Sequence, residues 1–80
     1  MLSDLKDKKK VIGTKQAKRA VINDKVEMMY IAKDADRFII DSLVQLCNEK
    51  TVDVVFVEHM KELGKACGID VSAASVALLK

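Results

Sequence analysis

The sequence predicts an α/β protein: a three-layer α/β/α sandwich around a small mixed sheet of about four strands. Short β-rich apolar runs alternate along the chain with longer segments whose apolar residues recur at helical spacing. The runs are nearly continuous in hydrophobic residues, which is typical of strands covered on both faces. Half of the 80 residues are hydrophobic and proline is absent, so the composition fits one folded domain over 1–80.

The expected elements alternate in type along the chain. A polar helix near 3–9 leads into a short strand at Val11 and Ile12. After it come, in order, a helix over 14–23, a strand over 28–32, a helix over 36–49, a strand over 52–57, a helix over 58–67 and a strand over 75–79. No stretch is left over for a second domain, and the sequence has no internal repeat.

Residues with known preferences for helix ends mark these boundaries. Asp36 is placed to cap the N-terminus of the helix that follows it, and Asn23 with Asp24 closes the preceding helix. Gly68 stands where glycine accepts the left-handed conformation that ends many helices. The helical repeat within 36–49 predicts an apolar face made of Phe38, Ile39, Leu43, Leu46 and Cys47.

Charge is distributed unevenly, although the net charge is only +2. Residues 1–25 carry eight Lys or Arg against three Asp, which leaves +5. Residues 26–80 carry six Lys or Arg against nine acidic residues, which leaves −3. A positive end favours a polyanionic partner, although charge alone is explained equally well by an ordinary lysine-rich terminus.

The cysteines and the N-terminus bear on the cellular compartment. Cys47 and Cys67 are too few and too far apart for a disulfide framework or a zinc ribbon, and free cysteines suit a reducing cytoplasm. The N-terminus lacks the apolar stretch of a signal peptide, and no run approaches the ~18 residues of a membrane span. We therefore expect a soluble, cytoplasmic protein.

The stretch 13–19 lies where a short strand passes into a helix. Gly13 permits a tight turn, and Thr14 is a candidate N-cap whose following amides are free to bind an anion such as phosphate. Lys15, Lys18 and Arg19 share one helix face near the N-terminus, where the helix dipole disfavours cations. From the residues alone, this cluster is either a solvated face or a binding site. Its spacing matches neither a P-loop nor a dinucleotide fingerprint.

A second stretch, 63–76, ends a helix, forms a loop and enters the last strand. Ile69 and Val71 lie in this loop. Taken by themselves, these side chains are more simply explained as packed under the sheet than as exposed. Exposed apolar side chains in such a loop would suit packing on an unstacked RNA base.

The remaining polar residues do not assemble into a reactive site. His59 stands alone and is interpreted as a surface or cap residue, while Asp34 and Asp36 suit capping and loop hydrogen bonds. No catalytic or metal-ligating group of residues can be put together from the sequence. We therefore expect no enzyme activity, no metal and no cofactor.

Three segments in a fixed order carry a resemblance to a known family: IGTKQAKRAV, YIAKDAD and LGKACGIDVSAASVAL. The chain resembles the kink-turn RNA-binding proteins. These comprise the archaeal large-subunit ribosomal protein "seven Ae", its spliceosomal and small nucleolar relatives, and short bacterial proteins of the YbxF and YlxQ type. The resemblance runs from Val11 to Leu79. The family signature after the glycine is Thr-Asn-Glu-x-x-Lys, whereas this chain has Lys15, Gln16 and Arg19, a version that the short bacterial members resemble.

The resemblance implies an RNA-binding surface built from both stretches. Lys15 and Gln16 would meet the base edges of tandem sheared G·A pairs, and the loop 69–71 would meet the flipped-out nucleotides of a three-nucleotide bulge, which reverses the preference for burial. The residues assigned to RNA binding are Gly13, Thr14, Lys15, Gln16, Lys18, Arg19, Lys33, Ile69, Asp70 and Val71. Asp36 and Arg37 stand where the family often has Asp-Pro, a departure that concerns helix initiation more than recognition.

The expected function is to recognise kink-turn RNA and to stabilise its kinked form, without covalent chemistry. The expected partner is structured RNA, either ribosomal RNA or a riboswitch. Neither DNA nor a membrane is expected to bind, and the protein is expected to be a monomer. The alternative is a protein–protein adaptor of the same fold, which is not expected to retain both the Gly-Thr-Lys-Gln turn and the Ile-Asp-Val loop.

Overall fold

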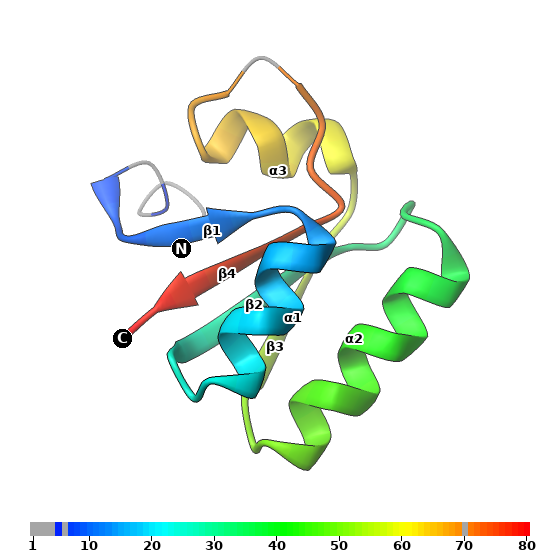
Figure 1. Ribbon diagram of the computed structural model, residues 1–80. Helices are drawn as coiled ribbons and strands as arrows, with labels where there is room; N and C mark the ends of the chain where they lie inside the picture. The colour runs from blue at the N-terminus through cyan, green and yellow to red at the C-terminus, as the bar shows by residue number, and fades with distance from the viewer. Residues whose placement is uncertain (1–4, 6, 70) are drawn as a thin grey trace.

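Four strands in the described part of the chain form one mixed sheet in the order β1-β4-β2-β3 (Figure 1). The structure, a computed structural model, describes residue 5, residues 7–69 and residues 71–80. β4 (Ser75–Leu79) pairs antiparallel with β1 (Lys10–Ile12) on one side and with β2 (Val26–Ala32) on the other. β3 (Asp53–Val57) pairs parallel with β2. The predicted mixed sheet is confirmed.

Helices cover both faces of this sheet, as the predicted three-layer sandwich requires. α1 (Thr14–Ile22) and α2 (Arg37–Glu49) lie side by side on one face (Figure 1). α3 (Met60–Ala66) lies on the opposite face. β1 and β2 run in the same direction because both are antiparallel to β4, so α1 and α2 begin at the same end of the sheet.

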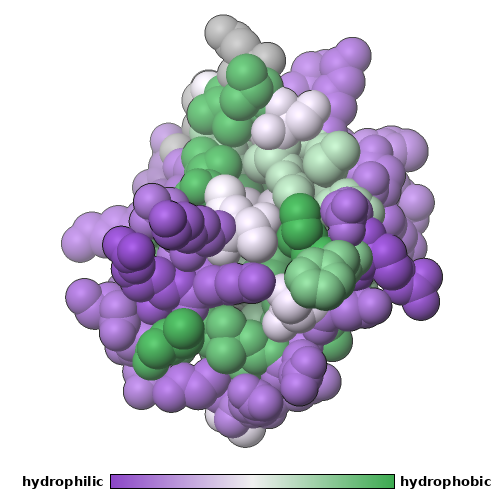
Figure 2. Space-filling view, turned by 45° about the vertical axis from the view of Figure 1, so that its right-hand side comes forward, coloured by the Kyte–Doolittle hydropathy of each residue, from purple (hydrophilic) through white to green (hydrophobic). Residues whose placement is uncertain are grey.

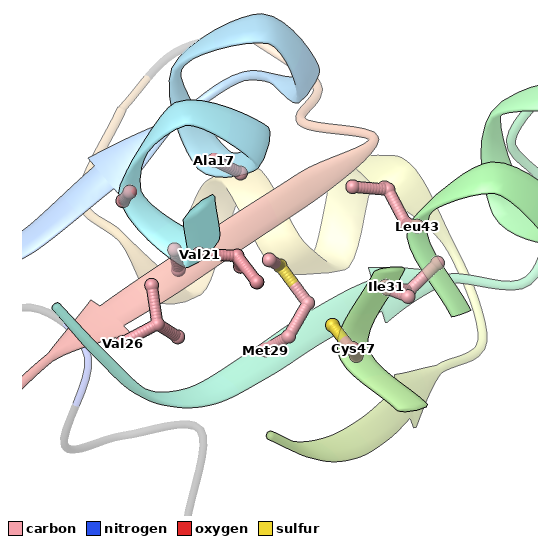
Figure 3. Close-up of a cluster of buried hydrophobic side chains, with 9 residues drawn as sticks. Ala17, Val21, Val26, Met29, Ile31, Leu43 and Cys47 are labelled. Carbon is pink, nitrogen blue, oxygen red and sulfur yellow. The ribbon is translucent and has the colours of Figure 1, made fainter. Parts of the chain in front are cut away.

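The face under α1 and α2 holds a hydrophobic cluster centred on β2 (Figure 3). Met29 of β2 is fully buried among Val21 of α1 and Leu43 and Cys47 of α2. Ala17 is also fully buried, and its small side chain lets α1 lie close to the sheet. Burial of each Val, Leu or Met side chain contributes about 1.5–3 kcal/mol, so this cluster is a main source of stability.

The opposite face holds a second cluster under α3. Leu63 is fully buried there, with Cys67 just beyond the end of the helix and Val76 of β4 beneath it. Leu5, in the segment before β1, is only 1% exposed and belongs to the same cluster. Both cysteines are free and buried, and they lie in different clusters on opposite faces of the sheet, so they do not pair with each other.

The predicted helix ends at Asp36 and Asn23 are confirmed. The Asp36 side chain caps α2 by accepting a hydrogen bond of 2.8 Å from the backbone N–H of Phe38. Asn23 is the C-cap of α1, and Asp24 after it has a φ of 57°. A left-handed residue directly after the helix turns the chain toward β2.

Two expectations about burial are wrong. Phe38 is 80% exposed instead of lying on the apolar face of α2, because it is placed opposite the side on which Leu43 and Cys47 are buried. β3 is not covered on both faces: Val55 is 36% exposed and Phe56 is 47% exposed. β3 is the edge strand, so only β2 flanks it and the helices extend only partly over it.

Of the expected polar helix near 3–9, the structure describes residues 5 and 7–9. Leu5 and Asp7 have the 3₁₀-helical conformation, Lys8 and Lys9 are not helical, and Leu5 is buried in the core instead of being solvated. Its burial ties the segment before β1 to the α3 side of the sheet. No helix in the described part of the chain is long and apolar enough to cross a bilayer.

Candidate functional site

One end of the sheet brings together segments that are far apart in the sequence. β1 and β2 end there and β4 begins there, because Ile12 pairs with Val76 and Ile31 pairs with Ser75. β3 ends at the same level beside β2. The turn at Gly13, the loops after β2 and β3, and the loop before β4 therefore all meet at this end.

Gly13 links β1 to α1 and fastens both to the start of β4. Its φ is 105°, in the region that only glycine adopts readily. Its N–H donates a hydrogen bond of 3.1 Å to the carbonyl oxygen of Ser75. The hydroxyl groups of Thr14 and Ser75 lie 3.4 Å apart. Because Ser75 is fully buried, these contacts hold the beginning of α1 against the end of the stretch 63–76.

The N-cap of α1 is Gly13 and not Thr14, which corrects the prediction. The Gly13 carbonyl accepts the first helical hydrogen bond, 2.9 Å from the N–H of Ala17. Thr14 is the first residue of the helix, and its hydroxyl lies beside Ser75 instead of over the first turn. Glycine has no side chain with which to cap the helix, so the positive end of α1 stays open to an anion.

Lys15 and Lys18 lie near this open end of α1, whereas Arg19 lies in the last turn of the helix, which corrects the prediction that all three cations are near its N-terminus. Lys15, Gln16 and Arg19 are exposed and Lys18 is half-buried. The first turn of α1 contains no acidic residue. Among the residues that the structure describes, no carboxylate forms an ion pair with Lys15, Lys18 or Arg19. Uncompensated positive charge next to an open helix N-terminus can hold a polyanion.

The second stretch begins with a capped helix end, and the predicted role of Gly68 is confirmed. Gly68 has a φ of 77°. Its N–H donates to the carbonyl of Lys65 at 3.0 Å, and the N–H of Ile69 donates to the carbonyl of Gly64 at 3.1 Å. These two bonds form a Schellman motif, which fixes the direction in which the loop leaves α3.

Gly64 is a site-forming residue that the sequence interpretation missed. A Cβ atom at this position would collide with the backbone carbonyl of Val71. The loop therefore packs directly on α3 at a point where only glycine fits. An isolated glycine inside a helical pattern is a known sign of close packing, and the segment LGKACG contains that sign.

The loop 69–71 is divided between core and surface. Ile69 is half-buried and packs against the cluster under α3, whereas Val71 is 68% exposed. The exposure of this loop that the resemblance implies thus applies to Val71, whereas Ile69 packs against the core. Asp70, the third predicted residue of this loop, lies outside the described part of the chain. Val71 offers an apolar surface close to the end of the sheet.

Lys33 lies at the same end of the sheet, in the loop after β2. Its backbone N–H donates to the carbonyl of Val57 at 2.7 Å. Its ammonium group lies 3.0 Å from a carboxylate oxygen of Glu58. This hydrogen bond and the positive charge of Lys33 lower the pKa of Glu58. Lys33 is therefore at the predicted place, but it is paired with an acidic neighbour.

Asp34 joins the loop after β2 to α3. Its carboxylate accepts a hydrogen bond of 2.7 Å from the N–H of Met60, the first residue of α3. The side chain of His59 is 66% exposed, and its Nδ1 lies 3.5 Å from the other carboxylate oxygen of Asp34. The predicted role of Asp34 in capping and loop hydrogen bonds is confirmed, although the helix that it caps is α3 and not the one that follows it in the sequence. The surface position of His59 is confirmed. No group of three or more His, Cys, Asp or Glu in the described residues is arranged to hold a metal ion.

The surface around α2 is not uniformly hydrophilic. Figure 2 shows green and white side chains gathered in the upper middle of this face, with hydrophilic side chains on both sides. The exposed large hydrophobic residues of α2, β3 and the loop before β4 are Phe38, Val55, Phe56 and Val71. A surface that mixes apolar side chains with cations suits a ligand that has both flat apolar parts and negative charge.

The structure is an α/β/α sandwich in which the uncapped, positively charged start of α1 and the loop packed on Gly64 of α3 lie at one end of the sheet. This arrangement is that of a small binding protein. The chain belongs to the family described as Ribosomal protein L7Ae/L30e/S12e/Gadd45, whose sequence profile matches residues 2–80. The resemblance found in the three sequence segments is thereby confirmed.

Individual relatives are similar over most of their length. The chain is 48% identical over 69 residues to an RNA-binding protein of Caldanaerobacter subterraneus subsp. tengcongensis, with 86% of this chain and 84% of that protein covered. It is 47% identical over 70 residues to the RNA-binding protein YbxF of Geobacillus stearothermophilus, with 88% and 85% covered.

Solved structures share the fold. A 15.5 kD RNA-binding protein of Giardia lamblia superposes with a TM-score of 0.86 at 30% identity. That match covers 99% of this chain, and the chain spans 65% of the Giardia protein. A protein of unknown function from Bacillus halodurans superposes with a TM-score of 0.90 at 23% identity, with 99% and 83% covered.

Proposed function

We propose that this protein binds RNA at the end of the sheet where α1 begins, and that its target is the kink-turn. The hydrogen bond from Gly13 to Ser75 carries this proposal, because it fastens the start of α1 to the start of β4, the strand that follows the loop with the exposed Val71. The relatives in Caldanaerobacter and Geobacillus are named as RNA-binding proteins, and so is the Giardia protein of similar structure, which supports RNA as the ligand.

Six of the predicted residues have distinct parts in this proposal. Lys15 would donate to guanine O6 or N7, and Gln16 would donate to and accept from base edges in the G·A pairs. Lys18 and Arg19 would neutralise phosphates. Val71 would pack on a base of the bulge, whereas the half-buried Ile69 would hold the loop in place.

Binding of this kind would act on RNA shape. A kink-turn exchanges between an extended and a sharply bent form, and a protein that binds only the bent form shifts the population toward it. The protein would thus stabilise the kinked RNA without any covalent chemistry. The family assignment is consistent with a ribosomal RNA target, and a riboswitch offers the same structural motif.

A paired titration tests the proposal. The protein is titrated against a kink-turn RNA and against a control RNA of equal length in which Watson–Crick pairs replace the G·A pairs. We expect tighter binding to the kink-turn and, in a doubly labelled RNA, an increase in energy transfer between the two helical arms. Equal affinity for both RNAs would show that the protein binds RNA non-specifically through its basic residues, and the proposal would be rejected.

A separate measurement distinguishes the two classes of RNA target. Co-sedimentation with ribosomal subunits at moderate salt is expected for a ribosome component. A regulator of riboswitch RNA would stay in the supernatant while still preferring the kink-turn in the titration.

A further inference from the structure

Phe38 is the most exposed large hydrophobic side chain in the described part of the chain, at 80%. It is the second residue of α2, and its backbone is held by the capping hydrogen bond from its N–H to Asp36. A side chain of this size is normally buried, since its burial is favourable. Phe38 instead presents an aromatic ring to solvent on a well-anchored helical turn.

Two cations lie at the same end of the sheet as Phe38. Arg37 directly precedes it and has an 89% exposed side chain, and Lys33 has a 54% exposed side chain. Both line an open groove of about 1030 Å³ between α2 and β3, whereas Phe38 lies outside this groove. Arg37 is the first residue of α2, where the helix dipole disfavours a positive charge, so the stability of the helix does not explain it.

Acidic neighbours are present but do not neutralise this group. Asp41 lies 3.5 Å from Nε of Arg37, and Glu58 pairs with Lys33. Both pairs are solvent-exposed and therefore contribute little to stability, so a phosphate can replace the carboxylate partner. An exposed aromatic ring and an exposed arginine in the same helical turn supply the stacking surface and the charge with which proteins bind unpaired nucleotides.

The position of Phe38 connects it to the proposed interface. α1 and α2 lie on the same face of the sheet and begin at the same end, so the first turns of both helices border that end (Figure 1). Ile22 provides a contrast, because it is 58% exposed at the other end of α1. Phe38 and Ile22 are both exposed, so exposure does not distinguish them as candidates for RNA contact. Their positions do, because only Phe38 lies at the end of the sheet where the proposed interface is.

We propose that Phe38 stacks on an unpaired base of the bound RNA and that Arg37 contacts a phosphate next to that base. The RNA interface would then extend from α1 to the first turn of α2. This inference rests on the proposed function, because it concerns a further nucleotide of the same RNA. Stacking is tolerant of base identity, so this contact would add affinity rather than sequence selectivity.

Introduced tryptophans test the stacking directly. The chain contains no tryptophan, so each variant carries a single indole fluorophore. We expect the emission of Phe38→Trp to be quenched when the kink-turn RNA of the paired titration is added, since stacking on a base quenches indole fluorescence. The matched control Ile22→Trp, at the far end of α1, should keep its emission.

Alanine variants measure the contribution to affinity. Phe38→Ala should weaken binding to the kink-turn RNA by roughly 5- to 150-fold, the range expected for loss of one base–aromatic stack. Ile22→Ala should leave it unchanged. Arg37→Ala should reduce the slope of log affinity against log salt by about one, as loss of one phosphate contact predicts.

The outcomes separate this inference from the proposed function. If the unmodified protein prefers the kink-turn while Phe38→Trp is not quenched and Phe38→Ala binds normally, the stacking contact is rejected and the proposed function stands. If the unmodified protein shows no preference for the kink-turn, the proposed function fails and the inference fails with it.

Discussion

The hydroxyl groups of Thr14 and Ser75 lie 3.4 Å apart, although 61 residues separate them in the sequence. Next to this pair, the N–H of Gly13 donates to the Ser75 carbonyl. These contacts join the cationic start of α1 to the start of β4, directly after the loop that carries Val71. They make one surface out of two segments from opposite ends of the chain.

Ser75→Ala tests how much this junction contributes. The substitution removes a fully buried hydroxyl and leaves Thr14 without this partner, so we expect the free energy of unfolding in urea to fall by about 0.5–1.5 kcal/mol. Ser72→Ala, at an exposed serine of the same loop, should have no measurable effect. Equal stability of the two variants would show that the hydroxyl pair contributes nothing.

Gly64→Ala tests the close approach of the loop to α3. Helix propensity by itself would make this change stabilising by about 0.5–1 kcal/mol. Because the added Cβ collides with the Val71 carbonyl, we expect a net destabilisation of about 1–3 kcal/mol, as in other overpacked sites. RNA affinity should fall as well, since the loop must move.

Lys61→Ala, at an exposed position of the same helix, is the control for Gly64→Ala and should keep its stability. A stabilised Gly64→Ala protein would contradict the packing of the loop on α3.

Asp34→Ala removes the acceptor that caps α3 from the loop after β2. We expect the free energy of unfolding to fall by about 1 kcal/mol, a usual value for the loss of a capping side chain. Asp34→Asn retains an oxygen that can accept from the Met60 N–H and should restore most of the loss. Chemical denaturation of both variants gives the comparison, and a similar loss in both would point to charge rather than to capping.

Lys15→Ala and Gln16→Ala should reduce the preference for kink-turn RNA over the Watson–Crick control by ~1–3 kcal/mol each, the usual range for a good base-edge contact. Lys18→Ala should instead weaken binding to both RNAs similarly and lower the salt dependence by about one unit of slope. Titrations at several salt concentrations separate these effects. Loss of salt dependence without loss of preference in the Lys15 variant would reassign that residue to phosphate contact.

The two buried cysteines are expected to lower the free energy of unfolding at alkaline pH. Burial raises the pKa of the Cys47 thiol above its ordinary value of 9.0. Burial also raises the pKa of Cys67, against the opposing positive charge of Lys10. A raised pKa means that the folded state holds the proton more tightly than the unfolded state. The resulting stabilisation is complete below pH 9.0 and is lost as the pH rises through the folded-state pKa.

We therefore expect the free energy of unfolding to decrease above pH 9.0, and to decrease less steeply in Cys47→Ala, whose unfolding no longer exposes this thiol. The comparison uses the slope of the free energy of unfolding against pH and not its absolute value, because the alanine also leaves a cavity that lowers the stability at every pH. Identical slopes would mean that the Cys47 thiol titrates alike in both states. Both thiols should also react slowly with a disulfide reagent until denaturant is added.

Local sequence patterns were sufficient for most of the fold. Continuous apolar runs predicted the strands, and β4 occupies the predicted range 75–79. Asp36, Asn23 and Gly68 marked helix ends correctly, because capping depends on hydrogen bonds between residues only a few positions apart. The N-cap at Thr14 was wrong because a distant residue, Ser75, is the neighbour of its hydroxyl.

The sequence by itself determined the α/β alternation, the helix ends that depend on near neighbours, and the cations of 13–19 as candidates for a polyanion site. The tertiary structure decided what depends on contacts between distant segments. It placed β3 at the edge of the sheet, left Phe38 exposed to solvent and buried Leu5. It also packed Ile69 against the core while leaving Val71 exposed, and it required glycine at position 64. Burial and close approach are properties of pairs of segments, and a local pattern records only one member of each pair.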